Sequence, residues 1–310
     1  VNPRIKDEFG VEKFDVIIGN PPFNASGNTN TGNTLWPNFV KTSLEILKQN
    51  AYLVFVHPAG WRKPESEKAK YKGLFKLMTH DNMMKYLEIH NTKDGNNVFN
   101  ANTRYDWYVI KKHKSNINTR IKDELGVESD VNLKNLEFLP NYKINVIKSL
   151  LKTNDKHVDV IYSRNTFGTD KKWVSSEETT EYKYKLVHST PAKGVRYLYT
   201  STRNPPVKEP TKMFGVPKVI FGDGGINHVI IDYKGKFGMT EHAIGIKINF
   251  IQEGEKLKKA LLSKKFKEIL DILNLSASYQ IDWRIFTMFK PDFYKHSMFK
   301  EKSSKTKTKK

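Results

Sequence analysis

The sequence contains no cysteine among its 310 residues. This absence excludes a disulfide framework, thiolate zinc sites, iron–sulfur clusters and a thiol nucleophile. The sequence also has no run of about 18 uncharged apolar residues, and its first ten residues, VNPRIKDEFG, lack the apolar core of a signal peptide. We therefore expect a cytoplasmic protein without a membrane partner.

Acidic residues are scarce relative to basic ones. The 33 Asp and Glu residues are outnumbered by 53 Lys and Arg residues, which gives a formal net charge of +20. Many cations on one solvated body repel each other unless a polyanion neutralises them, so nucleic acid is the expected partner. A hydrophobic content of 38% is enough for folded cores, and the length suits roughly two domains.

The first structural signal is a strand, a loop, a helix and a second strand. Phe14 to Ile18 form a β-branched run that ends at Gly19, which is typical of a strand buried on both faces of a parallel sheet. Residues 24–34 are almost all Asn, Gly, Thr and Ser, which predicts a mobile loop. A helix over residues 35–49 and a buried strand over residues 51–56 complete a βαβ unit with parallel strands.

The remaining sequence divides into three stretches. Residues 84–89 and 105–110 predict further strands of the same sheet, whereas apolar periodicity fades over residues 111–134. We place a domain boundary between Lys111 and Tyr142. Beyond it, short β-rich runs alternate with Gly, Pro and Asn turns, and one Lys-rich helix is expected over residues 255–273. Its lysines are typical of a solvated helix face, with backbone tracking along nucleic acid as the alternative.

The tetrapeptide Asn20-Pro21-Pro22-Phe23 follows the first strand directly and suits the methylation of a conjugated exocyclic amine. Such an amine is a poor nucleophile because its lone pair is delocalised into the ring. The side-chain oxygen of Asn20 and the backbone carbonyl of Pro21 are two acceptors that can hold the amine hydrogens out of plane, and the consecutive prolines stiffen the segment. Phe23 offers a face on which an extruded base can stack.

At these residues the sequence resembles the S-adenosylmethionine-dependent DNA methyltransferases that methylate amines, specifically the adenine-specific enzymes of the restriction-modification type (EC 2.1.1.72). In that family the Asn-Pro-Pro-aromatic tetrapeptide follows the fourth strand of a Rossmann-like sheet, and the resemblance covers most of residues 10–110. It implies that Asn20, Pro21, Pro22 and Phe23 are catalytic and that Phe23 stacks on a flipped adenine. It also implies S-adenosylmethionine as cofactor and double-stranded DNA as partner.

The resemblance implies an α/β fold in three parts. Residues 1–135 would be the C-terminal part of the catalytic domain, with its Rossmann-like sheet. Residues 136–300 would be a β-rich α+β target-recognition domain, and residues 301–310 a disordered basic tail.

The cofactor loop of this family has no counterpart ahead of Asn20. Family members carry a strand–loop–helix with Phe-x-Gly-x-Gly, and the nineteen residues before Asn20 cannot hold it. Phe221 to Gly225 is the one similar run, but its glycines have other offsets and a returning strand is expected over residues 228–232, so we predict a hairpin turn there. We expect the cofactor-binding residues in a missing methyltransferase segment upstream of Val1, which as a first residue itself suggests a longer protein.

Three weaker signals leave alternatives open. A second tetrapeptide, Asn204-Pro205-Pro206-Val207, lacks a preceding strand and a stacking face, so it is predicted to be a surface turn. Asp223 together with Asp232 and Lys234 is similar to the metal-binding carboxylates and lysine of restriction nucleases. The histidines show no metal-ligand spacing, so no metal is expected.

The competing functions are a non-catalytic DNA-specificity fragment and a methyltransferase that acts on RNA or on a protein glutamine.

Overall fold

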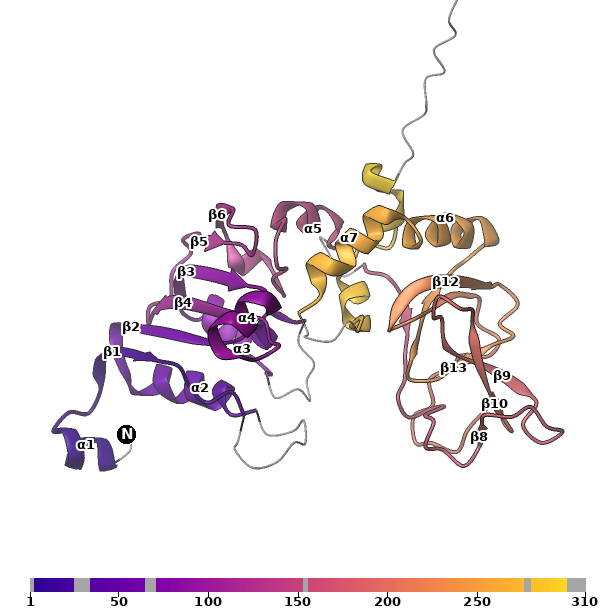
Figure 1. The fold of residues 1–310 in the computed structure, drawn as a ribbon, viewed down its shortest axis with the longest axis horizontal. Coiled ribbons are helices and arrows are strands. Elements are labelled where there is room, and N and C mark those ends of the chain that lie inside the picture. The colour runs from indigo at the N-terminus through magenta and orange to yellow at the C-terminus, as the bar shows by residue number, and fades with distance from the viewer. Residues whose placement is uncertain (1–2, 25–33, 65–70, 153–155, 276–279, 300–310) are drawn as a thin grey trace, which may run out of the picture. The chain divides into compact units, whose positions relative to one another are not determined.

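The computed structural model describes residues 3–24, 34–64, 71–152, 156–275 and 280–299 (Figure 1). The chain divides into two compact units: unit 1 comprises Val1–Ile144 and Leu275–Ser278, and unit 2 comprises Asn145–Asn274 and Tyr279–Lys310. Most of the predicted mobile loop and the whole predicted basic tail lie outside the described residues. None of the helices within the described ranges is long and apolar enough to cross a membrane.

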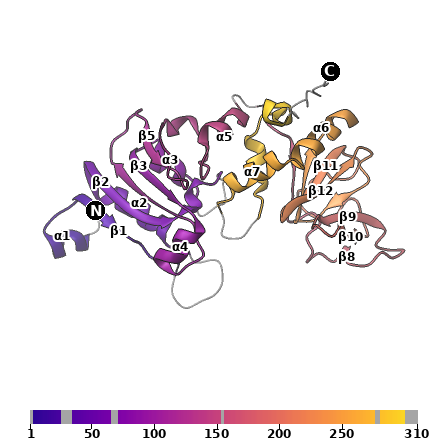
Figure 2. The ribbon, with the colours of Figure 1, turned by 45° about the horizontal axis from the view of Figure 1, so that its top comes forward.

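Unit 1 is built on a six-stranded mixed sheet with the order β1-β2-β4-β3-β5-β6 (Figures 1 and 2). Its strands are β1 (Phe14–Gly19), β2 (Leu47–Pro58), β3 (Met83–His90), β4 (Tyr105–Lys111), β5 (Thr119–Lys122) and β6 (Glu128–Val131). Its helices are α1 (Pro3–Phe9), α2 (Trp36–Ile46), η1 (Ala59–Arg62), α3 (Leu74–Thr79), α4 (Thr92–Phe99) and η2 (Leu133–Asn135). The predicted α/β class is confirmed, and so is the parallel pairing of the first two strands.

The prediction that the first strand is buried on both faces was wrong. β1 is an edge strand that pairs only with β2 among the strands described. Val16 is 50% exposed and Ile18 is 74% exposed. A β-branched run indicates a strand, but the position of that strand in its sheet depends on neighbours that the run itself does not encode.

The two faces of this sheet differ in how well they are covered. On one face, Leu53, Phe55 and His57 of β2 are buried, and Trp36 of α2 stacks on His57 with ring centroids 4.0 Å apart. The other face, which we call the open face, carries partly or largely exposed side chains on three neighbouring strands: Val16, Ile18, Tyr52, Val54, Val56, Trp107 and Val109. The described helices therefore leave one apolar face of β1, β2 and β4 incompletely covered.

Two local predictions needed correction. The predicted helix over residues 35–49 ends at Ile46, and Leu47 already belongs to β2. The polar stretch at residues 111–134 contains β5 and β6, which extend the sheet beyond β3. Each of these strands has only four residues and few apolar ones. The pairing of β5 with β3 and of β6 with β5 therefore stabilises them more than their own composition does.

Unit 2 contains two four-stranded sheets, with the orders β13-β9-β10-β8 and β12-β11-β14-β7. Its strands are β7 (Val160–Ile161), β8 (Val174–Ser175), β9 (Tyr184–Ser189), β10 (Arg196–Thr200), β11 (Lys218–Gly222), β12 (Gly225–Asp232), β13 (Gly238–Met239) and β14 (Ala243–Lys247). Its helices are α6 (Ile251–Leu261), α7 (Lys264–Leu273), η3 (Trp283–Met288), η4 (Phe293–Lys295) and η5 (Ser297–Phe299), while α5 (Ile144–Leu150) begins at the unit boundary. The expected β-rich α+β character is confirmed.

The single Lys-rich helix predicted over residues 255–273 is in fact two helices. Ser263 separates α6 from α7, and its side chain accepts a hydrogen bond from the N–H of Phe266 at 3.1 Å. A serine in this position caps a new helix and so interrupts the previous one. The predicted apolar stripe of Leu257, Leu261, Phe266 and Leu270 is buried.

Candidate functional site

The predicted catalytic tetrapeptide lies in unit 1 and directly follows the C-terminal end of β1. Asn20 and Pro22 are exposed, Pro21 is buried and Phe23 is half-buried. The carbonyl of Phe23 accepts a hydrogen bond from the N–H of Leu35 at 3.2 Å, directly before α2. The tetrapeptide is therefore fixed by β1 on one side and by the start of α2 on the other, with the side chain of Asn20 open to solvent.

A glycine allows the end of β1 to lie close to its neighbour. A Cβ atom built on Gly19 would lie 3.1 Å from Cε1 of Phe55 on β2. Any larger residue would require this buried ring to shift by a few tenths of an ångström. Gly19 thus allows the close approach of β1 and β2 directly before the tetrapeptide.

Phe23 begins a row of aromatic rings that the sequence analysis did not identify. Its ring contacts the ring of Phe99 edge-to-face, with centroids 5.5 Å apart and planes at 68°. Phe99 in turn contacts Tyr105 at 4.9 Å and 88°, and Tyr105 stacks on His90 at 4.4 Å and 2°. We call Phe23, Phe99, Tyr105 and His90 the aromatic row; it fixes the plane of the Phe23 ring.

Phe99 is the last residue of α4, and local contacts position this helix. Asn91 caps the helix by accepting a hydrogen bond from the N–H of Asp94 at 3.0 Å. A Cβ atom on Gly95 would lie 2.0 Å from the carbonyl oxygen of Thr103, so only glycine lets α4 lie this close to the segment before β4. No periodic sequence signal connects Phe99 with Phe23, because the contact depends on how α4 packs.

His57 lies near the end of β2 and is fully buried. Its Nδ1 lies 3.0 Å from the carbonyl oxygen of Pro58, so Nδ1 donates, and Nε2 accepts from the hydroxyl of Tyr108 at 2.9 Å. Burial lowers the pKa of His57 to about 3. The ring is therefore neutral at pH 7 and serves as a packing and hydrogen-bonding element, not as a general base.

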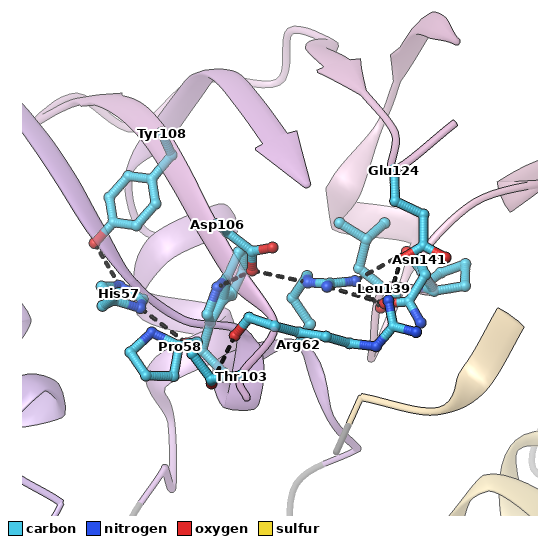
Figure 3. Close-up of polar contacts among 12 residues, drawn as sticks. His57, Pro58, Arg62, Thr103, Asp106, Tyr108, Glu124, Leu139 and Asn141 are labelled. Atoms are coloured by element: carbon cyan, nitrogen blue, oxygen red, sulfur yellow. Dashed lines mark hydrogen bonds and ion pairs between the residues drawn. The ribbon is translucent and has the colours of Figure 1, made fainter. Parts of the chain in front are cut away.

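A buried ion pair lies beyond His57 in the same unit (Figure 3). The side chains of Arg62 and Asp106 are both 0% exposed, and Nε of Arg62 donates to Oδ2 of Asp106 at 2.8 Å. Nε1 of Trp61 donates to the same oxygen at 2.8 Å. Desolvation raises the pKa of Asp106, while the Arg62 charge and these hydrogen bonds oppose that rise. The pair is structural, since both groups are closed off from solvent.

The other donors of Arg62 hold the last segment of unit 1. Nη1 donates to the carbonyl oxygens of Leu139 and Pro140 at 3.2 Å and 3.1 Å, and Nη2 donates to the side chain of Asn141 at 3.0 Å (Figure 3). The carbonyl of Arg62 accepts from the N–H of Leu139 at 3.0 Å. Arg62, the last residue of η1, therefore attaches residues 139–141 to the segment that directly follows β2.

The glycine run in unit 2 is a hairpin, as predicted. β11 and β12 are antiparallel, with Gly222 paired to Gly225, so Asp223 and Gly224 form the turn. Asp232 lies at the opposite end of β12, roughly 20 Å away for a strand of this length. There it pairs with the buried Lys218 at 2.8 Å. The carboxylates of the nuclease alternative are therefore not brought together.

Metal binding finds no support in the parts of the chain that the structure describes. No three His, Asp or Glu side chains within these ranges are grouped so that they could hold a metal ion.

Residues 2–99, which contain β1, the tetrapeptide and Phe99, match the model of a family described as Eco57I restriction-modification methylase. This confirms the resemblance to restriction-modification methyltransferases. An uncharacterized adenine-specific methylase of Mycoplasma pneumoniae is 42% identical over 60 residues, which make up 18% of this chain and 14% of that protein. The methylase-like part thus covers the predicted site, and the chain spans a small share of this relative.

Solved structures of restriction-modification proteins show partial likenesses. The Type IIL restriction-modification enzyme MmeI, solved in complex with DNA, gives a TM-score of 0.48 at 10% identity, over 93% of this chain and 51% of MmeI. The M protein of the Type I restriction enzyme EcoKI gives a TM-score of 0.29 at 14% identity, over 38% of this chain and 26% of that protein.

Proposed function

We propose that the protein is the target-binding part of an adenine-specific DNA methyltransferase from a restriction-modification system. One observation carries this proposal: an exposed Asn20 begins an Asn-Pro-Pro-Phe tetrapeptide at the C-terminal end of a strand. The tetrapeptide lies within the segment that matches the Eco57I restriction-modification methylases. In open α/β sheets, ligands bind beyond the carboxyl ends of the strands, which is where Asn20 lies.

We assign different roles at the target base to the residues of the tetrapeptide. Asn20 and the carbonyl of Pro21 would accept the two hydrogens of the exocyclic amine and so localise its lone pair. Phe23 would stack on the base after extrusion, which offsets part of the few kcal/mol that extrusion costs. Phe99 holds the Phe23 ring edge-to-face, so the stacking plane exists before the base arrives.

The residues that the structure describes do not by themselves fit S-adenosylmethionine, the methyl donor that we expect. The tetrapeptide would form one wall of its pocket. Within the described ranges, the run most similar to the required glycine loop is the β11–β12 hairpin of unit 2, which has a strand where a helix is needed. We therefore propose that a cofactor-binding segment outside residues 1–310 completes the site.

Unit 2 is proposed to bind double-stranded DNA as the target-recognition domain, with unit 1 as the catalytic part. The β9–β10 ribbon of unit 2 and the segment after it combine cations with aromatic rings. Nζ of Lys185 lies 5.9 Å from the ring centroid of Tyr197, and Arg203, which follows β10, lies 4.6 Å from that of Tyr184. Together with the net charge of +20, this favours a phosphate-rich partner, and binding should weaken steeply as salt rises.

The identity of the methylated group tests the proposal. Residues 1–310 are combined with the cofactor-binding polypeptide, duplex DNA and labelled S-adenosylmethionine, and the DNA is digested to nucleosides for mass spectrometry. N6-methyladenine is the expected product. N4-methylcytosine would overturn the adenine assignment, and label in RNA or in a glutamine side chain would favour those substrates. Tight DNA binding without any transfer would favour a non-catalytic DNA-specificity fragment.

A further inference from the structure

His90, the last member of the aromatic row, lies at the same edge of the sheet as the predicted catalytic tetrapeptide. β1 and β2 are parallel, and β4 is antiparallel to both β2 and β3, so β3 runs in the same direction as β1. The carboxyl ends of β1 and β3 therefore share one edge. His90 ends β3 at that edge, paired with Tyr105, the first residue of β4.

The His90 ring lies between two carboxylates from different elements. Its Nδ1 lies 3.4 Å from Oδ2 of Asp94 on α4, and its Nε2 lies 3.4 Å from Oε1 of Glu88 on β3. Nε2 is buried and makes no hydrogen bond within the described ranges, so its contact with Glu88 is purely ionic. A neutral imidazole has one N–H and would turn a nitrogen lone pair toward one of the two carboxylates, whereas an imidazolium has an N–H for each. The geometry therefore favours the charged ring.

The charges that face this ring come from four elements. Glu88 of β3 is also paired with Lys122 of β5 at 3.0 Å. Asp106 of β4 interacts electrostatically with the ring, and it is already paired with the buried Arg62 at 2.8 Å. Asp94 of α4 has the imidazole as its ion-pair partner among the described side chains. The charge on the ring therefore serves mainly to hold α4.

Two routes connect the His90 ring with Phe23. The first is stacking: the ring lies on Tyr105 at 4.4 Å and 2°, and Tyr105 contacts Phe99 at 4.9 Å. The second is the ion pair with Asp94, because Asp94 belongs to α4, the helix that ends at Phe99. Phe99 in turn contacts Phe23 at 5.5 Å. A cation over an aromatic face strengthens the stack, so both routes are stronger when the imidazole is protonated.

We propose that His90 is a positioning residue for methyl transfer: in its protonated form it fixes α4 and Tyr105, and through them the plane of the Phe23 ring. This inference rests on the proposed function, in which the target base stacks on Phe23. Imidazoles change charge between about pH 5 and about pH 8, so the stacking plane should become less fixed as the pH rises through that range. His57 does not interfere, because burial lowers its pKa to about 3.

The first test is the pH dependence of single-turnover methyl transfer at saturating DNA and S-adenosylmethionine. It uses the complemented enzyme, which is residues 1–310 combined with the cofactor-binding polypeptide. Near pH 6 the wild-type rate should exceed the His90→Gln rate about threefold to tenfold, and near pH 8.5 by less than about twofold. His90→Arg supplies a planar cation at every pH, so it should exceed His90→Gln by a similar factor at both pH values.

Two further variants locate the effect. Asp94→Asn removes the carboxylate on α4 and should reproduce the loss seen in His90→Gln, and the double variant should be hardly worse than either single one. His113→Gln is the matched control, because His113 is exposed and follows β4 at the opposite edge of the sheet. It should keep the wild-type rate and pH profile within about twofold.

The second test needs no activity and follows the Phe23 ring directly. Residues 1–310 are labelled with ¹³C in their phenylalanine rings, and the Phe23 resonance is assigned by its loss in Phe23→Leu. Its chemical shift should change with pH at the same midpoint as the His90 imidazole, and this change should be absent from His90→Gln. Circular dichroism checks that each variant folds. Should His90→Gln not fold, the wild-type titration and His90→Arg still decide.

Several outcomes would overturn the inference. These are a ratio of wild-type to His90→Gln rates that does not vary with pH, a His90→Arg variant that loses activity as the pH rises, and a Phe23 resonance that does not follow His90. Failure of the proposed function would look different. A Phe23 ring that follows His90 in a complex that methylates no adenine would leave the positioning role standing and remove the proposed reaction.

Discussion

The chain contains the same three residues, Asn-Pro-Pro, in two places with different surroundings. At Asn20 they follow the C-terminal end of β1, and the residue after them, Phe23, contacts Phe99. At Asn204 they follow a bend in which the N–H of Asn204 donates to Oγ1 of Thr202 at 3.1 Å and the hydroxyl of Thr202 donates to the carbonyl of Asn204 at 3.2 Å. The residue after them, Val207, has no aromatic ring.

The difference shows that the same three residues have different surroundings at the two places in the fold. The backbone of Asn204 is engaged by its own turn, and the neighbouring Arg203 lies over Tyr184 and Phe214 as part of unit 2 packing. Asn20 instead lies at the end of a sheet strand, where a substrate can approach. The prediction that Asn204-Pro205-Pro206-Val207 is a turn agrees with these contacts.

The sharpest test of this comparison is to remove each asparagine in turn. Asn20→Ala in the complemented enzyme should lower single-turnover methyl transfer by roughly 10²–10³-fold, as does loss of one stabilising group in other preorganised sites. DNA affinity should stay unchanged, because the role we propose for Asn20 is on the amine and not on phosphates. Asn204→Ala should leave both quantities within about twofold. Equal losses in the two variants would remove the distinction.

Buried His57, which stacks with Trp36 of α2, makes unit 1 sensitive to acid. Its folded-state pKa of about 3 lies below the ordinary value of 6.5. Below pH 6.5 the unfolded chain therefore binds a proton that the folded chain does not. The free energy of unfolding should fall as pH drops from 6.5 toward 3, by up to about 1.4 kcal/mol per pH unit. Urea unfolding at several pH values measures this slope, and His57→Gln should remove that contribution.

The fourth residue is a further difference between the two tetrapeptides, because Phe23 has an aromatic ring and Val207 has none. Phe23→Ala should lower methyl transfer on duplex DNA by about 1–3 kcal/mol in transition-state stabilisation, the usual contribution of base–aromatic stacking. The loss should be smaller on a target base placed opposite a mismatch, since extrusion is then easier. Val207→Ala is the matched control. A loss of the same size on both substrates would argue against stacking.

The smallest predicted effect concerns Phe99, whose ring contacts those of Phe23 and Tyr105. Phe99→Ala should reduce methyl transfer by about 0.5–1.5 kcal/mol, the usual contribution of an aromatic pair. The double variant Phe23→Ala, Phe99→Ala should then be hardly worse than Phe23→Ala alone. Additive losses would show that Phe99 acts independently of Phe23. Val98→Ala is the control, because Val98 lies at an exposed position of α4 next to Phe99.

The sequence predicted those parts of the fold whose signals are local. β1, β3 and β4 were expected nearly at their observed bounds because each combines apolar residues with β-branched or aromatic ones. β5 and β6 were missed because four residues with a single apolar side chain among them do not resemble a strand until they pair. The tetrapeptide could be found from its own chemistry. The exposure of Ile18 and the contact of Phe99 could not, since both depend on which distant elements lie nearby.

The attachment of residues 139–141 by Arg62 has a consequence for dissecting the protein. A fragment that stops at residue 135 would retain the buried Arg62 and Asp106 but lose the carbonyls of Leu139 and Pro140 and the amide of Asn141. Buried guanidinium N–H groups would then lack acceptors, and each such loss costs about 1–3 kcal/mol or more. Unit 1 can therefore be produced alone in stable form only if it extends through Asn141, although those residues contribute no strand to its sheet.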